Sequence, residues 1–279
     1  MEAKEKEKQD KILLFIPAYN CAPQIVRVLA KLNSVPPGLF AEILILDNQS
    51  KDETNKVAAE SLSKVSRHIV KVGRNRNNYG LGGSHKAAFN YADLNGFTHV
   101  AVLHGDDQGD VLELLPILEA GRHREVDACL GSRFMKGAKT PGYSRFRVFG
   151  NHVFNRLFSA VAQRRVTDLG SGLNVFSRQV FVDADVRHFS DDLRFNCYLL
   201  LNLIDKKRSI EFFPITWREE DQISNVRLFS QTVKTLEIVK EYLFQRSKFR
   251  TSDHRPNSVA SYDFDVIART NPQEITFED

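Results

Sequence analysis

The first half of the chain alternates short apolar segments with helical patterns, and this alternation limits the fold more than any other feature. Apolar runs lie at residues 11–16, 42–46, 68–72 and 100–103, and residues 22–33 carry apolar side chains at helical spacing. Most of these runs are bounded by Pro, Gly, Asn or Asp, which is typical of buried strands. Strands that alternate with helices pair mostly in parallel and are covered on both faces. The sequence therefore predicts an α/β fold around a mostly parallel sheet.

The second half is more mixed but continues the same domain. It predicts two strands, at 127–131 and 210–213, and two helices, at 145–162 and 191–205. We expect four divisions of the chain: a disordered charged lead-in over 1–10, an α/β domain over 11–225, an amphipathic helix within 226–250 and a loosely packed tail over 251–279.

Composition excludes several classes of protein. The formal net charge of +4 permits an acidic ligand or a membrane surface but does not require nucleic acid. The three cysteines are far apart in the sequence, which is typical of reduced thiols. No apolar run is long enough to span a bilayer, and the charged start is unlike a signal peptide. These features predict a cytoplasmic protein.

Polar segments follow three of the predicted strands, at the edge where open α/β sheets bind ligands. They cover residues 17–20, 47–54 and 104–109. If the last segment stays extended, the side chains of His104, Asp106 and Gln108 project to one face. Their imidazole, carboxylate and amide groups would then meet where the sheet reaches solvent. The alternative is an ordinary polar turn after a buried strand.

Two further segments have structural interpretations. Ser50 and Glu53 have the spacing of a capping box, which predicts a helix from residue 51. The glycines of NYGLGG fall at 80, 82 and 83, so the dinucleotide-binding fingerprint is absent. We interpret this stretch as a tight turn before a helix over 84–94.

The strand-end motifs PAYN, DNQSKDET and HGDDQ, followed by GSRF, resemble the family 2 glycosyltransferases of the GT-A fold. The likeness covers residues 11–225 and is greatest to the branch of dolichyl-phosphate mannose synthase and of bacterial polyprenyl-phosphate and polysaccharide glycosyltransferases. It implies a nucleotide-sugar donor, a divalent metal (Mn²⁺ or Mg²⁺), inversion at the anomeric carbon, and a polyprenyl-phosphate or glycan acceptor.

The resemblance also assigns roles to the donor-side residues. It implies that the base and ribose are lined by Pro17, Ala18, Tyr19 and Asn20. Asp47 would hydrogen-bond the base, because a carboxylate accepts the imide N–H of a uracil-type ring. Asn48 stands where relatives often have a second Asp, which leaves the choice of donor open.

The metal segment departs from the family pattern, since His104 replaces the first Asp of Asp-x-Asp. The resemblance implies Asp106 as a ligand with Gln108, and a metal there would neutralise the leaving diphosphate. His104 is either a ligand, which would favour Mn²⁺, or a hydrogen-bond partner of a phosphate. Asp107 would replace Gln108 if the backbone turns early.

Basic and acidic residues further along complete the implied site. Arg133 matches a phosphate-binding position, with an ordinary surface arginine as the alternative. Arg218 and Ser224 resemble a late basic loop that closes over the donor phosphates. Asp191 and Asp192 stand where sugar-acceptor relatives keep a catalytic base. Capping of a helix is the alternative for this pair, and a lipid phosphate would need no base.

The predicted helix over 226–246 carries an apolar stripe, formed by Val226, Phe229, Val233, Leu236, Val239 and Leu243. With Lys234 and Lys240 outside the stripe, such a helix can lie on the inner membrane face. Packing against the domain is the alternative, and Glu237 and Glu241 favour it. Two other functions also stay open: a nucleotidyltransferase on a similar sheet, and a non-catalytic nucleotide-sugar-binding homologue.

Overall fold

The computed structural model describes residues 10–65, 67–221, 228–257 and 259–270. They form one mixed sheet in the order β7-β5-β6-β4-β1-β2-β3-β8. The strands are β1 (Ile12–Ala18), β2 (Glu42–Asp47), β3 (Val70–Asn75), β4 (His99–Leu103), β5 (Ala128–Ser132), β6 (Leu173–Ser177), β7 (Ile210–Pro214) and β8 (Phe264–Arg269). β6 and β8 are antiparallel to their neighbours, and the other six strands share one direction.

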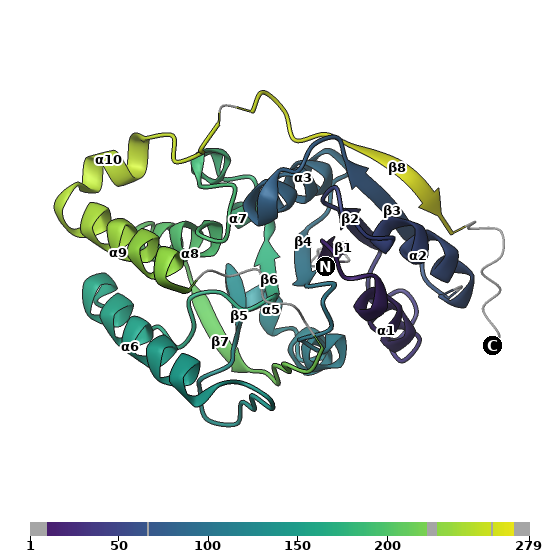
Figure 1. The fold of residues 1–279 in the computed structure, drawn as a ribbon, viewed down its shortest axis with the longest axis horizontal. Coiled ribbons are helices and arrows are strands. Elements are labelled where there is room, and N and C mark those ends of the chain that lie inside the picture. Colours follow the sequence, from purple (N-terminus) through teal and green to yellow (C-terminus); the bar gives the residue numbers. More distant parts are fainter. Residues whose placement is uncertain (1–9, 66, 222–227, 258, 271–279) are drawn as a thin grey trace, which may run out of the picture.

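Helices cover both faces of the sheet (Figure 1). They are α1 (Ala22–Leu32), α2 (Thr54–Glu60), α3 (Gly80–Leu94), α4 (Leu115–Glu119), α5 (Arg122–Glu125), α6 (Arg145–Ala162), α7 (Arg178–Phe181), α8 (Phe195–Asp205), α9 (Leu228–Phe244) and α10 (Arg246–Thr251). Short 3₁₀ turns lie at Ser61–Lys64, Val111–Leu114 and Ala184–His188.

The alternation of side chains along the central strands produces two cores. In β1, Leu13 and Phe15 pack in a core with α3, α8 and α9, whereas Leu14 and Ile16 pack in a core with α1 and α2. All of these strand residues are fully buried, as expected for strands covered on both faces. Among the described residues, no helix is long and apolar enough to cross a bilayer.

The glycine-rich stretch is part of a helix, and the prediction of a turn before residue 84 is wrong. α3 begins at Gly80, and the backbone N–H of Gly82 donates to the carbonyl of Asp191 at 2.7 Å. A Cβ on Gly82 would lie 2.3 Å from the carbonyl oxygen of Ser190. The glycines therefore allow the first turn of α3 to pack directly against the backbone of 190–191.

The expected loose tail is wrong for residues 264–269. They form β8, which pairs antiparallel with β3 at the edge of the sheet. Tyr262, just before this strand, donates its hydroxyl to Asp191 at 2.7 Å. The tail therefore crosses the domain and adds the outermost strand next to β3 (Figure 1).

Candidate active site

The predicted site residues gather at the C-terminal ends of the parallel strands, which form one edge of the sheet, called the ligand edge below. Ala18 and Asp47 are paired in register at the ends of β1 and β2. The segments after β4, β5 and β7 reach the same edge, and so does the segment before the antiparallel β6. The described residues at this edge include the polar segments after β1, β2 and β4 and also Arg133 and Arg218.

Hydrogen bonds join the loop after β1 to the loop after β2. The backbone N–H of Asn20, at φ 49°, donates to Ser50 Oγ at 2.9 Å, and Asn20 Oδ1 accepts from Lys51 N at 2.8 Å. Asp47 is 1% exposed and accepts from Ser50 N at 3.3 Å. Tyr19 stays 37% exposed beside these loops. The two loops are thus joined by hydrogen bonds, with the Tyr19 ring partly exposed beside them.

The capping-box prediction is wrong, because Ser50 is committed to Asn20. Helix α2 begins at Thr54, and Glu53 at its N-cap makes no capping hydrogen bond with its side chain. Asp52 Oδ1 accepts from Thr54 N at 3.0 Å instead. Ser50 therefore shapes the ligand edge and does not start a helix.

Asn48 connects this edge to the next loop. Its Oδ1 accepts from Asn75 Nδ2 at 3.0 Å and from Tyr79 N at 2.9 Å, and its Nδ2 donates to Asn78 Oδ1 at 2.9 Å. With these three bonds the amide holds β2 against the start of α3. This structural role explains why an amide can stand where relatives often have a second Asp.

The segment after β4 does not stay extended, so the predicted alternation of residues 104, 106 and 108 is wrong. Asp107 has a φ of 60°, which reverses the chain. Its Oδ2 lies 2.7 Å from Arg27 Nε, and its Oδ1 lies 2.6 Å from Lys31 Nζ. Asp107 is therefore directed to α1, although the early turn on which its ligand role depended does occur.

The same turn places Asp106 and Gln108 against the segment after β7. Gln108 N donates to Asp106 Oδ1 at 3.2 Å, and Gln108 Nε2 donates to the carbonyl of Arg218 at 3.1 Å. Arg218 N returns a bond to the carbonyl of Gln108 at 2.9 Å. Burial raises the pKa of the Asp106 carboxyl to about 6. A divalent cation beside this carboxyl would stabilise its ionised form.

His104 lies behind this turn and is neutral at pH 7. Burial, together with the charge of Arg133, lowers the pKa of the imidazole to about 4. Its Nε2 is buried and has no hydrogen-bond partner within the described part of the chain. A Cβ on Gly172 would lie 2.4 Å from the ring, so only glycine fits there. A neutral imidazole with an unsatisfied nitrogen fits both a metal and a phosphate.

Arg133 is held by an acidic partner that the sequence did not indicate. Its guanidinium donates to both carboxylate oxygens of Asp168, at 2.7 and 2.8 Å, and Asp168 is fully buried. The guanidinium carbon also lies 5.4 Å from the Trp217 ring centroid. Asp168 thus occupies the Nε and Nη2 side of the guanidinium, and Nη2 also donates to the carbonyl of Gly170 in the segment that packs on His104.

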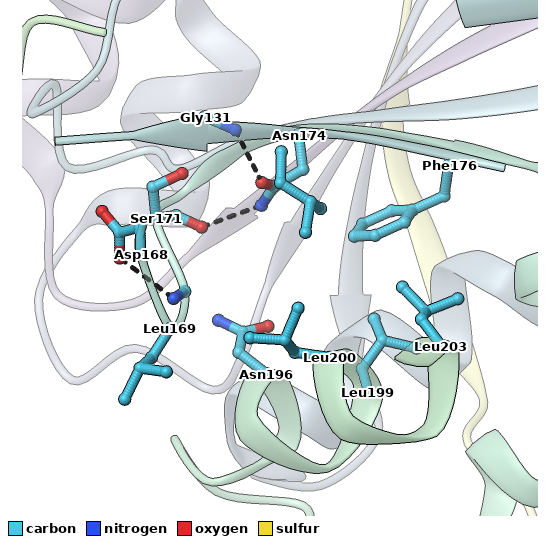
Figure 2. A pocket seen from close by; sticks show the side chains of 12 residues that line it. Gly131, Asp168, Leu169, Ser171, Asn174, Phe176, Asn196, Leu199, Leu200 and Leu203 are labelled. Carbon is cyan, nitrogen blue, oxygen red and sulfur yellow. Dashed lines mark hydrogen bonds between the residues drawn. The ribbon is translucent and has the colours of Figure 1, made fainter. Parts of the chain in front are cut away.

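Asp168 also lines a small cavity between the start of β6 and α8 (Figure 2). Its volume of about 20 Å³ suits one water and no substrate. Asn174 bridges its wall, accepting from Gly131 N at 3.2 Å and donating to the carbonyl of Ser171 at 2.8 Å. The cavity therefore lies among the residues that hold the site in place and is not itself a substrate pocket.

Asp191 and Asp192 already have protein partners. Asp191 Oδ1 accepts from Lys86 Nζ at 2.6 Å and from the Tyr262 hydroxyl. Asp192 Oδ1 accepts from the backbone and side chain of Arg194, each at 2.9 Å, just before α8. Both residues also line a cavity of about 380 Å³ together with residues 77–80 and the tail. Ser224 lies outside the described residues, so its predicted role is untested.

Several residues of this edge were not indicated by the sequence. Arg27 and Lys31 belong to no recognisable motif. They lie on the polar side of an amphipathic helix, where basic residues are common. Asp168 and Gly172 lie in a stretch whose glycines indicate only a break in the chain. Trp217 is the one tryptophan in the sequence, and only this rarity could have drawn attention to it.

Comparison with known proteins agrees with this geometry. The family described as Glycosyl transferase family 2 matches residues 14–184. Polyprenol monophosphomannose synthase of Mycolicibacterium smegmatis is 23% identical over 75% of this chain and 78% of its own. Dolichol-phosphate mannosyltransferase of Pyrococcus furiosus is 29% identical, over 49% of this chain and 37% of its own.

Solved structures show the same fold. Glucosyl-3-phosphoglycerate synthase from Mycobacterium tuberculosis, in complex with Mn²⁺, uridine diphosphate and glucosyl-3-phosphoglycerate, superposes with a TM-score of 0.59 at 16% identity. The match covers 96% of this chain and 92% of that one. The predicted GT-A-type α/β fold and the predicted resemblance are both confirmed. The chain belongs to glycosyl transferase family 2 and is a glycosyltransferase that uses a nucleotide sugar.

Proposed function

We propose that this enzyme transfers a sugar, with inversion, from a nucleotide-diphosphate donor to a lipid-linked phosphate. The donor would lie across the edge formed by the loops after β1, β2 and β4. Pro17, Ala18, Tyr19 and Asn20 would contact the base and ribose, and Asp47 would accept a hydrogen bond from the base. The hydrogen bond from Asn20 N to Ser50 Oγ, which joins the loops after β1 and β2, supports this placement.

The residues after β4 suit a divalent metal, Mn²⁺ or Mg²⁺. Asp106 and Gln108 offer oxygen ligands, and the unsatisfied Nε2 of buried His104 supports a third, nitrogen contact to metal or phosphate. A bound metal neutralises charge on the leaving diphosphate. Arg218, whose Nη2 lies 3.7 Å from Asp110, would add positive charge at the same edge. We leave Asp107 out of the binding set because Arg27 and Lys31 occupy it.

The hydrogen bonds of Asp191 and Asp192, the two candidates for a catalytic base, are the reason for proposing a phosphate acceptor. Asp191 is buried and bonded to Lys86 and Tyr262, and Asp192 is bonded to Arg194. A sugar hydroxyl needs a base to remove its proton, whereas a lipid phosphate is already ionised. The commitment of both carboxylates therefore favours a phosphate acceptor over a glycan.

A transfer assay tests this proposal. Purified enzyme is given radiolabelled nucleotide sugars with Mn²⁺ or with chelator, and with polyprenyl phosphate or a free sugar as acceptor. We expect label to enter the organic phase only with polyprenyl phosphate and Mn²⁺. Transfer to the sugar that is lost in Asp192→Asn would support the glycan acceptor instead. Donor binding without turnover would support the non-catalytic homologue, and transfer of a nucleotidyl group would support the nucleotidyltransferase.

A further inference from the structure

An acid-free stretch surrounds helix α6. Residues 128–167 contain no Asp or Glu, yet they include eight basic residues, at 133, 136, 139, 145, 147, 156, 164 and 165. Because the whole chain has a formal charge of +4, the remaining residues are net negative. Positive charge is therefore concentrated on one part of the molecule.

Much of that charge is free to face an outside partner. Arg133 and Arg147 are paired with Asp168 and Glu219. Five others, namely Lys136, Lys139, Arg145, Arg156 and Arg165, are exposed and have no ion pair within the residues that the structure describes.

The outer face of α6 is apolar as well as basic. Phe146 is 77% exposed, Phe149 65% and Val153 46%. Their spacing of three and four residues puts them on one face. The adjoining face packs on the core through Phe158, Phe154 and Leu157. The exposed rings are thus additional to the face that holds the helix on the domain.

The position of this face relates it to the active site. Arg147 Nη1 lies 2.7 Å from Glu219 Oε2, next to Arg218, whose backbone bonds to Gln108. The backbone N–H of Glu219 also donates to the carbonyl of Pro141, just before α6. The apolar beginning of α6 is therefore joined directly to the catalytic edge.

We propose that α6 docks the enzyme on an anionic lipid bilayer, with Phe146, Phe149 and Val153 entering the interface and Arg145 and Arg156 meeting the headgroups. An amphipathic helix of this kind combines aromatic insertion with attraction to anionic lipid. A second copy of the chain is a poor occupant, because a twofold interface would set the same basic patch against itself. Docking would bring the active site to a lipid-phosphate acceptor in the bilayer, and this consequence rests on the proposed function. The docking itself does not rest on it.

This surface differs from the stripe within 226–246, for which the sequence left membrane contact open beside packing on the domain. In α9, Val239 is buried with Ile238 and Tyr242, so part of the predicted stripe packs on the domain. Val233, Leu236 and Leu243 are 42–47% exposed, but exposed Glu237 lies among them. Val226 lies outside the described residues, and nothing is described of the Phe229 side chain.

Vesicle flotation tests the proposal, using phosphatidylcholine vesicles with and without phosphatidylglycerol at low and high salt. We expect the wild type to float only with phosphatidylglycerol and less at high salt. Arg145→Glu with Arg156→Glu should lower partitioning by more than about tenfold, since each basic residue near anionic lipid contributes about fivefold. Phe146→Ser with Phe149→Ser should also abolish flotation.

Matched controls separate this surface from others. Lys234→Glu with Lys240→Glu reverses the same number of charges on α9, and Leu94→Ser removes an apolar side chain that is also 77% exposed. Both should float like the wild type. A wild type that never floats, an α9 variant that loses as much as the α6 variant, or a dimer that the Phe146→Ser, Phe149→Ser variant dissociates would overturn the proposal. Transfer to a detergent-solubilised short-chain acceptor reports on the proposed function independently.

Discussion

Replacing Asp106 by alanine is expected to abolish Mn²⁺-dependent donor binding and to leave the fold intact. The carboxylate lies in a turn beyond the end of β4, and its Oδ1 accepts from Gln108 N of the same turn. A bound metal supplies several kcal/mol of charge stabilisation, so sugar transfer should fall about a thousandfold or more. Calorimetric titration of nucleoside diphosphate with and without Mn²⁺, alongside circular dichroism, measures both parts of this result.

Asp107→Ala is the matched control, since it removes the adjacent carboxylate of the same turn. Asp107 pairs with Arg27 and Lys31 of α1, so its loss should lower stability but keep the Mn²⁺ dependence. The assignment of Asp106 is wrong if its alanine variant still binds donor in an Mn²⁺-stimulated way.

Asp168→Ala is expected to be strongly destabilising. The Asp168 side chain is 1% exposed and that of Arg133 13%, so the variant leaves a guanidinium buried without its partner. Breaking such a pair costs about 3–5 kcal/mol of unfolding free energy. Because this pair also fixes the segment that packs on His104, donor affinity should fall in the fraction that stays folded.

Urea denaturation of Asp168→Ala and of Asp93→Ala compares the free energy of unfolding that each variant loses. Asp93 pairs with Arg178 at the surface, where both side chains are more than a third exposed. An exposed pair contributes about 1 kcal/mol or less. Equal losses in the two variants would contradict the idea that the Arg133–Asp168 pair supports the site.

The sequence predicts well those elements that local pattern determines. Apolar runs gave β1, β2, β4 and β7 nearly to the residue, and the apolar spacing of 145–162 gave α6. The ligand edge was also predictable, because parallel strands bring their carboxyl ends together. Polar residues directly after those strands therefore identify the site without any knowledge of distant contacts.

Features that depend on distant contacts were not predictable. β8 pairs with β3 across nearly two hundred positions, as Lys71 opposite Arg269 shows. Its Val266 and Ile267 side chains are 50% and 45% exposed, so this edge strand is not a buried apolar run. The reversal at Asp107 needs a positive φ at a residue other than glycine, which α1 stabilises through Arg27 and Lys31. Asp191 has the sequence context of a base, but Lys86 and Tyr262 surround it only in the folded chain.

The location of the metal tests the central claim most directly. Among the described residues, Asp10, His99 and His123 form a cluster of potential ligands that lies at the opposite edge of the sheet, before β1 and at the start of β4. Crystals grown with Mn²⁺ and nucleoside diphosphate can be examined by anomalous diffraction at the manganese edge. We predict one peak between Asp106 and the diphosphate, with or without His104 in contact. A peak only at Asp10, His99 and His123, with diphosphate bound and no metal beside Asp106, would contradict the account.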